Sequence, residues 1–230
     1  MSIHDGHRSR LKARFLESGL DGFTDIQVLE LLLFYAIPRR DTNPIAHALL
    51  DKFGSVRQVM EAPLARLTEV EYITENAATL LKLAPAMLRY YQVDKIVNEK
   101  PLLTISECGD YLKHFFIGKK NETVYLLSLD AKCKVLSCRQ VGEGSVNSAN
   151  VPIRRVVEIA LAEGASTVIL AHNHPSGIAI PSGEDVATTR RLAAALSAVD
   201  VILADHIVVA DDDYVSMVQS GYRFDDCLII

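Results

Sequence analysis

The residues with the clearest chemical potential lie in the stretch AHNHPSGIAIPSGED, which runs from Ala171 to Asp185. His172 and His174 are separated by one residue and follow an apolar run, residues 166–171, that predicts a short buried strand. Side chains two positions apart on a strand point to the same side, so both imidazoles would face one point. With the Asp185 carboxylate from the next element they would supply three ligands, which leaves a catalytic zinc ion one position for water.

A simpler interpretation exists for each of these residues. The two histidines would be exposed and without a role at the end of a strand. Asp185 also fits a capping box, in which Ser182 is the N-cap of a helix and the acidic residue takes the third helical position. A carboxylate in the first turn of a helix is nevertheless held rigidly and can face a metal. The spacing of the whole set, directly after an apolar strand, favours a metal site.

The composition of the chain predicts a globular protein with a substantial core. Its 230 residues are enough for one large domain or two ordinary ones, and 49% of them are hydrophobic. The formal net charge is -5, whereas general nucleic-acid binders are more often basic. A role on DNA would therefore have to depend on a local basic patch.

The cysteines and the lack of long apolar runs predict a cytoplasmic protein without a membrane segment. The N-terminal residues MSIHDGHRSRLKARF contain no signal-peptide core, and no apolar run approaches the length of a membrane span. The cysteines form no CxxC pair, which is typical of reduced thiols. They are Cys108, Cys133, Cys138 and Cys227.

The pattern along the chain predicts two domains and a linker. Residues 1–94 have helical periodicity and few strand signals. Charged residues and Pro101 interrupt the periodicity over residues 95–104, which we interpret as the linker. Residues 105–230 alternate strands with helices, which predicts an α/β domain built on one sheet.

The elements of the second domain must position the histidines. A polar turn over 118–122 precedes two β-prone runs, 123–130 and 134–141, which predict a hairpin. The loop GEGSVNSANVP follows the hairpin. The remaining predicted elements are a helix closed by Gly164, the strand that ends at the histidines, a helix over 182–199 and a strand over 201–210.

The phrase TEVEYITENAATLLKL in the first domain resembles the second half of a helix-hairpin-helix module. Such hairpins present backbone N–H groups to a DNA phosphate and usually have a Gly-hydrophobic-Gly sequence, where the glycines allow close approach and a positive φ. Here Tyr72, Ile73 and Thr74 occupy these positions. We therefore favour a helical packing module without the phosphate site over a DNA-binding hairpin.

The chemical motif carries a family resemblance. His-x-His, seven residues, Ser, two residues and Asp is the JAMM signature of JAB/MPN-type zinc metalloproteases, met in full by His172, His174, Ser182 and Asp185. The phrases HNHPSG, PSGED and LADHIVVADDDYVSM, with HRSRLKARFLESGLDGF, LLLFYAIPRRDTNPIA and ENAATLLKL upstream, resemble the bacterial RadC family. The resemblance implies an α/β C-terminal JAB/MPN-like domain, cytidine-deaminase-like in fold, after a small all-α helix-hairpin-helix-like domain.

The resemblance also implies roles at the site. His172, His174 and Asp185 would bind one zinc ion, and Ser182 would donate a hydrogen bond to the oxyanion. A glutamate from an upstream strand or loop would act as the general base, and we favour Glu143 in the glycine-flanked GEGS loop. The alternatives, Glu158, Glu163 and Glu184, have simpler interpretations as solvated helix residues or as partners of the helix dipole.

Three further residues are candidates for the surroundings of the metal. Asp205 could accept the second N–H of a ligating imidazole, because such imidazoles usually donate to a carboxylate or a carbonyl. His206 lies on an apolar strand, so it is either a satisfied core histidine or a partner of the ligands. Asn173 alternates away from the metal face, and we expect it to hold the Pro-Ser-Gly turn.

These observations support three hypotheses. The first is a zinc-dependent hydrolase of peptide or isopeptide bonds that acts on a protein or peptide substrate. The second, motivated by the hairpin-like module, is a DNA-associated protein in repair or recombination whose metal site is accessory or structural. The third is a binding scaffold that retains the metal without catalysis.

Overall fold

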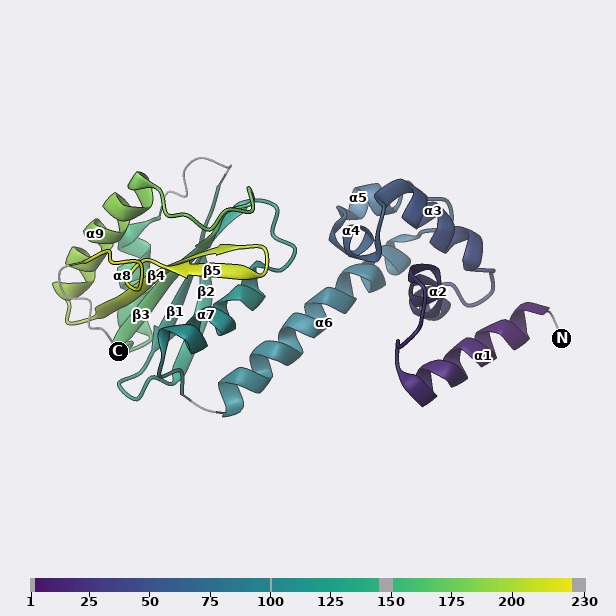
Figure 1. The fold of residues 1–230 in the computed structure, drawn as a ribbon, viewed down its shortest axis with the longest axis horizontal. Coiled ribbons are helices and arrows are strands. Elements are labelled where there is room, and N and C mark those ends of the chain that lie inside the picture. Colours follow the sequence, from purple (N-terminus) through teal and green to yellow (C-terminus); the bar gives the residue numbers. More distant parts are fainter. Residues whose placement is uncertain (1–2, 100, 145–150, 225–230) are drawn as a thin grey trace. The chain divides into compact units, whose positions relative to one another are not determined.

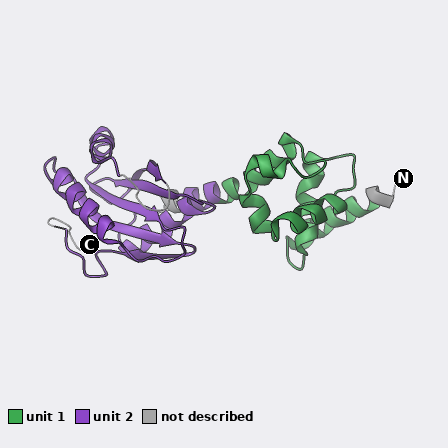
Figure 2. Cartoon of the chain, turned by 90° about the horizontal axis from the view of Figure 1, so that it is seen from above, with its two compact units in different colours: residues 1–88 green, residues 89–230 purple. Residues whose placement is uncertain are grey.

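The computed structural model describes residues 3–99, 101–144 and 151–224, without the side chains of residues 3–5 and 95–99. The chain forms two compact units, Met1–Leu88 and Arg89–Ile230, which Figure 2 shows in green and purple. Within the described residues, no helix combines the length and the apolar character needed to cross a membrane. Residues 145–150 of the predicted GEGSVNSANVP loop, and Cys227, lie outside the described residues.

The first unit is helical, as the periodicity of the sequence predicts (Figure 1). Its core consists of buried leucines, alanines and other apolar residues from several helices, among them Leu29, Leu49, Leu67 and Leu81. Thr24 caps the second helix through a complete capping box, and Gly54 ends the third. The helices are α1 (Ile3–Ser18), α2 (Asp25–Ala36), α3 (Asn43–Phe53), α4 (Val56–Glu61), α5 (Leu64–Leu67) and the first part of α6 (Glu75–Glu99).

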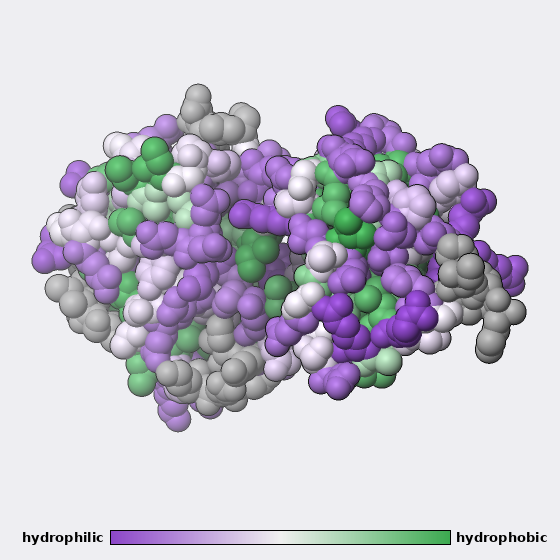
Figure 3. Space-filling view, turned by 45° about the vertical axis from the view of Figure 1, so that its right-hand side comes forward, coloured by the Kyte–Doolittle hydropathy of each residue, from purple (hydrophilic) through white to green (hydrophobic). Residues whose placement is uncertain are grey.

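Helix α6 continues through the position where the two units divide. It runs without interruption to Glu99, so the first half of the segment that we interpreted as a linker, 95–104, is helical. Several large apolar residues of this helix are exposed, including Met87, Tyr90 and Tyr91. On the face shown in Figure 3, hydrophobic residues form separate small groups within a mostly polar surface.

The hairpin-like segment before α6 retains a left-handed turn without glycine. Tyr72 has φ 67°, and the Ile73 amide donates to the Val70 carbonyl at 3.0 Å. The Arg40 guanidinium lies 3.8 Å from the centroid of the Tyr72 ring. The turn therefore has a positive φ without glycine, at the conformational cost that a residue with a Cβ incurs.

The second unit contains a five-stranded sheet with the order β2-β1-β3-β4-β5. Strands β3 and β4 are parallel, and every other neighbouring pair is antiparallel. A parallel pair needs a crossover, which the helix between them supplies. The elements are α7 (Ile105–Lys113), η1 (His114–Phe116), β1 (Glu122–Leu129), β2 (Val135–Gly144), α8 (Ile153–Ala162), β3 (Thr167–Asn173), α9 (Gly183–Ser197), β4 (Ile202–Ala210) and β5 (Asp213–Ser216).

Two apolar layers cover the two faces of this sheet. Alternate residues of β1 and β3, such as Leu126 and Leu170, pack with Leu192 and other residues of α8 and α9. The intervening residues, such as Leu127 and Ile169, pack with residues of α7. The period of two residues thus assigns each side chain of β3 to one face, and His172 belongs to the face covered by α9.

Candidate metal centre

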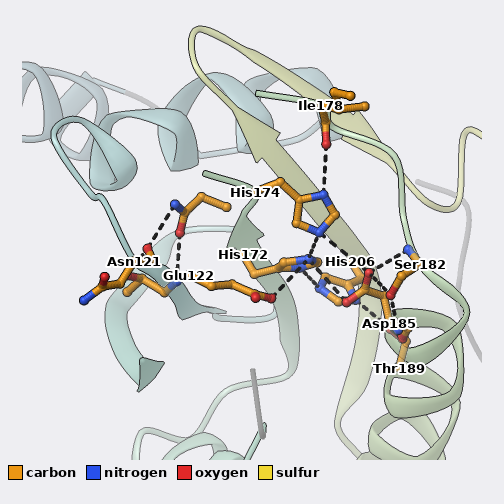
Figure 4. Close-up of polar contacts among 11 residues, drawn as sticks. Asn121, Glu122, His172, His174, Ile178, Ser182, Asp185, Thr189 and His206 are labelled. Carbon is orange, nitrogen blue, oxygen red and sulfur yellow. Dashed lines mark hydrogen bonds and ion pairs between the residues drawn. The ribbon is translucent and has the colours of Figure 1, made fainter. Parts of the chain in front are cut away.

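The two histidines and the aspartate of the predicted site converge on one point (Figure 4). His172 Nε2 lies 2.9 Å from His174 Nε2 and 3.3 Å from Asp185 Oδ1. His174 Nε2 lies 3.8 Å from Asp185 Oδ2. Ligand atoms about 2.0–2.1 Å from a tetrahedral zinc ion lie roughly 3.3 Å apart, so these separations fit such an ion.

A fourth residue, Glu122, joins this group. Its Oε1 lies 4.0 Å from His172 Nε2, and one ligand atom from each of the four residues lies within 4.8 Å of the others. Strand register explains its position, because Val124 pairs with His172 and Glu122 is two residues from Val124 on the same face. The structure corrects our assignment of this residue to a polar turn, since β1 begins at Glu122.

The start of helix α9 fixes Asp185. Ser182 is the N-cap, and its hydroxyl accepts from the Asp185 amide at 3.1 Å. Asp185 Oδ2 in turn accepts from the Ser182 amide at 2.7 Å and from its hydroxyl at 2.6 Å. This capping box occupies one carboxylate oxygen and leaves Oδ1 directed at His172, so capping and metal binding use different oxygens.

A chain of hydrogen bonds behind the site fixes the tautomer of His172. The Thr189 hydroxyl donates to the Asp185 carbonyl at 2.6 Å, so it accepts from His206 Nδ1, which also lies at 2.6 Å. His206 Nε2 then carries a lone pair and accepts from His172 Nδ1 at 2.8 Å. His172 must therefore present its Nε2 lone pair to the site.

The tautomer of His174 follows from a separate contact. Its Nδ1 lies 2.9 Å from the Ile178 carbonyl, which can only accept a hydrogen bond. His174 therefore also presents an Nε2 lone pair, and the two lone pairs face each other at 2.9 Å beside the carboxylate of Asp185. Such an arrangement is repulsive unless a cation or a proton lies between the nitrogens.

Burial disfavours a proton on the His172 ring. Burial lowers the pKa of His172 to about 4, and the opposing attraction of Asp185 does not restore it. Burial also lowers the pKa of His206 well below its ordinary value. Both imidazoles are thus neutral near pH 7, the state in which histidine binds metals.

The structure places Glu143 away from the histidines. The residue lies on β2 rather than in the loop where we expected it, because the ladder with β1 continues as far as Gly144. Its exposed carboxylate accepts from Asn121 Nδ2 at 3.1 Å and from Gln140 Nε2 at 2.9 Å. These hydrogen bonds, first that from Asn121, lower the pKa of Glu143.

The other candidate glutamates also lie outside the site. Glu158 forms an exposed ion pair with Arg154, and Glu163 binds the Ser137 hydroxyl and the Arg139 side chain. Glu184 is exposed in the first turn of α9. None of the three belongs to the group formed by the histidines, Asp185 and Glu122.

The remaining predicted residues divide between two regions. His206 is the partner of His172, whereas the buried Asp205 carboxylate accepts from the amides of His206 and Val218 and from the Ser216 hydroxyl. Asp205 therefore organises the connection between β4 and β5. Asn173 does point away from the metal face, but its amide binds the backbone of Asn121 and Thr123 instead of the turn after His174.

Sequence reasoning missed Glu122 and Thr189. Thr189 follows Asp185 by four residues, which places both on one face of α9, and this spacing was a usable signal. Glu122 could be identified only from the pairing of β1 with β3, which joins residues 50 positions apart in a register that the sequence does not state.

Comparisons with known proteins agree with this geometry. Residues 102–222 match a family profile described as a RadC-like JAB domain. A UPF0758 protein of Fusobacterium nucleatum is 33% identical over 225 residues, which are 95% of this chain and 97% of the relative. UPF0758 proteins of Ruegeria pomeroyi and Rhodobacter capsulatus are 33% and 36% identical, over 94% and 92% of this chain and 96% and 99% of theirs.

Proposed function

The chain belongs to the family of proteins with a RadC-like JAB domain, and from this premise we propose that it is a zinc-dependent hydrolase of peptide or isopeptide bonds. The substrate class that we propose is a protein or a peptide. We place the enzyme in the cytoplasm, a proposal supported by the free thiols of Cys108, Cys133 and Cys138.

One observation carries the proposal. The hydrogen bonds of His172 and His174 leave two imidazole lone pairs facing each other at 2.9 Å, with carboxylate oxygens of Asp185 at 3.3 and 3.8 Å. Two nitrogens and a carboxylate are a typical donor set for zinc. A zinc ion bound here would lower the pKa of a coordinated water and polarise the carbonyl of the scissile bond.

We assign the role of general base to Glu122 in place of Glu143. The Glu122 carboxylate is buried and lies 4.0 Å from His172 Nε2, whereas the carboxylate of Glu143 is held by Asn121 and Gln140. Oε1 of Glu122 would take a proton from the attacking water and return it to the leaving nitrogen. The burial of Glu122 beside the ligands supports this assignment.

We retain Ser182 as the donor to the oxyanion, with a condition. Its hydroxyl proton is directed at Asp185 Oδ2 at 2.6 Å, so the hydroxyl must turn toward the substrate to stabilise an oxyanion. Removing one such donor typically costs about 10²–10³ in kcat. The first role of Ser182 in this arrangement is to orient Asp185.

Two measurements test the proposal. Mass spectrometry of metals in the purified protein should find about one zinc ion per chain, the stoichiometry of a single site with three protein ligands. Incubation with a peptide mixture that includes lysine isopeptides should give hydrolysis products, and Glu122→Gln should abolish them while retaining zinc. A protein that binds no zinc, or a Glu122→Gln variant with full activity, would contradict the proposal.

A second candidate function has one observation in its favour. The turn at Tyr72 keeps its left-handed conformation, and Arg40 lies against the Tyr72 ring, which puts a cation beside the hairpin. We propose as the alternative that this hairpin binds DNA and that the metal site acts on DNA-bound proteins or is structural. Fluorescence anisotropy with branched and single-stranded DNA tests it: binding should weaken steeply with salt and be lost in Arg40→Ala. No binding at low salt would exclude this alternative.

A further inference from the structure

Asn173, the residue between the two histidines, binds the backbone on both sides of Glu122. Its Oδ1 accepts from the Thr123 amide at 2.8 Å, and its Nδ2 donates to the Asn121 carbonyl at 3.2 Å. Asn173 is 5% exposed, so these bonds are shielded from water. One side-chain amide thus fixes the peptide groups before and after Glu122.

The ladder between β1 and β3 explains why a side chain is needed here. Backbone pairing of the two strands ends at Val124 and His172. One residue further along, Asn173 supplies through its side chain the contact that the backbone no longer makes. A primary amide suits this position because it carries a donor and an acceptor, while a carboxylate cannot donate and an aliphatic chain can do neither.

Strand alternation gives three consecutive residues two tasks. The side chains of His172 and His174 lie beside Asp185 (Figure 4). Asn173, between them in sequence, points to the opposite face of the strand. From there it holds the backbone of Glu122, whose own side chain returns to the metal face and reaches within 4.0 Å of His172 Nε2. The strand that presents the ligands therefore also sets the position of Glu122 relative to them.

A second contact supports the same segment from β2. Asn121 Nδ2 donates to Glu143 Oε1 at 3.1 Å, and Glu143 Oε2 accepts from Gln140 at 2.9 Å. Glu143 thus stabilises the residue whose carbonyl Asn173 binds. The segment before β1 is fixed from β3 on one side and from β2 on the other.

From this geometry we propose that Asn173 is a positioning residue, which holds the Glu122 carboxylate against the metal ligands. The proposal rests on the proposed function, because Glu122 needs a position only if it acts beside a metal. A purely structural tie between β1 and β3 would predict lower stability in an Asn173 variant and no effect specific to Glu122.

A double-mutant cycle on the cobalt-loaded protein separates these two roles. We would compare the wild type, Asn173→Ala, Glu122→Gln and the double variant by the pH midpoint of the visible cobalt absorption. Glu122→Gln should shift this midpoint by roughly 1–3 pH units, the range for a charge about 4–6 Å away. Asn173→Ala should shift it in the same direction by roughly one unit and should add nothing in the Glu122→Gln background.

Controls keep the outcomes distinct. Ser137→Ala, which removes a hydrogen bond between β2 and the C-cap residue of α8, Glu163, should leave the midpoint unchanged. If Asn173→Ala does not fold, Asn173→Ser takes its place in the cycle with the same expected result. Cobalt affinity and thermal stability are measured for every variant.

Three results would overturn the inference. A protein that binds neither zinc nor cobalt contradicts the proposed function, and this inference with it. A normal midpoint in Glu122→Gln removes the base that Asn173 is proposed to position. A shifted midpoint in Glu122→Gln with a normal midpoint in the folded, metal-loaded Asn173 variant contradicts the role of Asn173 alone.

Discussion

The helical unit and the α/β unit differ in the polar residues that they bury. Among the described residues, the helical unit buries two polar side chains, Glu30 and Thr42. The α/β unit buries a larger set, most of which lies on β1, β3, β4 and the elements beside them: Glu122, Thr123, His172, Asn173, Thr189, Asp205, His206 and Ser216. Burying a polar group costs free energy unless it is hydrogen-bonded, and the histidines of this set are bonded to one another or to Thr189. The proposed metal site lies among these buried polar groups.

One turn in each unit shows a similar difference. The turn at Tyr72 keeps a demanding backbone conformation and exposes its side chain, whereas the turn after His174 places the Ile178 carbonyl on the ring of a proposed ligand. The first turn keeps a left-handed backbone conformation, and the second fixes the tautomer that leaves the Nε2 lone pair of His174 free to face the site. The predictions below test this contrast.

The largest expected effect is the loss of zinc affinity in a histidine variant of the α/β unit, compared with a histidine variant of the helical unit. His174→Ala removes one of the proposed ligands. Loss of a residue that only hydrogen-bonds to a ligand typically lowers metal affinity by roughly 10–100-fold, and we expect His174→Ala to lower zinc affinity by more than that. His47→Ala, at an exposed position of α3, should leave zinc binding unchanged. Competition with a chromophoric chelator measures both. Equal affinities in the two variants would contradict the metal site.

A smaller effect is expected from the hydrogen-bond chain behind His172. Thr189→Val removes the acceptor of His206 Nδ1, so zinc affinity should fall by about 10–100-fold. Thr189→Ser keeps the hydroxyl and should bind zinc nearly as the wild type does. Thr188→Val serves as the matched control, since the Thr188 hydroxyl accepts from Arg191 at 3.4 Å. Unchanged zinc affinity in Thr189→Val would mean that the hydrogen bonds from Thr189 through His206 do not orient His172.

Acid should destabilise the metal-free α/β unit more than the helical unit. The pKa of His172 is about 4 in the folded state and 6.5 ordinarily, so below pH 6.5 the unfolded chain takes up a proton that the fold excludes. Stability is therefore lost as pH falls from about 6.5 toward 4, by about 2 kcal/mol at pH 5 from His172 alone. Hydrogen exchange of the chelator-treated protein at pH 7 and pH 5 measures each unit. An equal loss in both units would contradict this assignment.

The smallest effect is expected at the hairpin of the helical unit. Tyr72→Gly relieves about 1–2 kcal/mol of left-handed strain, but it loses the contact with Arg40 and gains unfolded-state entropy. The free energy of unfolding should therefore change by less than about 1 kcal/mol, which denaturant titration can measure. Gly54→Ala is the comparator, since its Cβ would meet Gln58 Oε1 at 2.5 Å at φ 95° and should destabilise. A larger change in the free energy of unfolding of Tyr72→Gly would show that the Tyr72 side chain contributes more than the contact with Arg40.

Local patterns in the sequence predicted the elements and the group of residues that we propose as metal ligands. The capping residues Thr24 and Ser182, the strand before His172 and the crossover helix all follow from signals a few residues long. The convergence of His172, His174 and Asp185 could be predicted because they lie close in sequence, at the end of a strand, directly after it and in the first turn of the next helix.

Residues brought together by strand pairing could not be predicted in the same way. Glu143 was preferred because it follows the hairpin in sequence, but antiparallel register brings Glu122 to the histidines and leaves Glu143 on the edge strand β2. The role of Asn173 was missed for the same reason, since its partners Asn121 and Thr123 lie about 50 positions away. The alternation of side chains along a strand predicts the face of the sheet on which a residue lies. Only the register of strand pairing determines which residue of the neighbouring strand lies beside it.

The parallel pairing of β3 with β4 has a consequence for the order of folding. The proposed site combines Glu122, the segment from His172 to Thr189, and His206, which meet only when β1 and β4 have both paired with β3. The three proposed ligands, His172, His174 and Asp185, lie in one local segment, whereas Glu122 and His206 come from strands that must first pair with β3. The proposed base Glu122, and His206 that sets the tautomer of His172, therefore reach the ligands only once the sheet has formed. A zinc ion bound by the complete site would add stability to the folded protein by mass action.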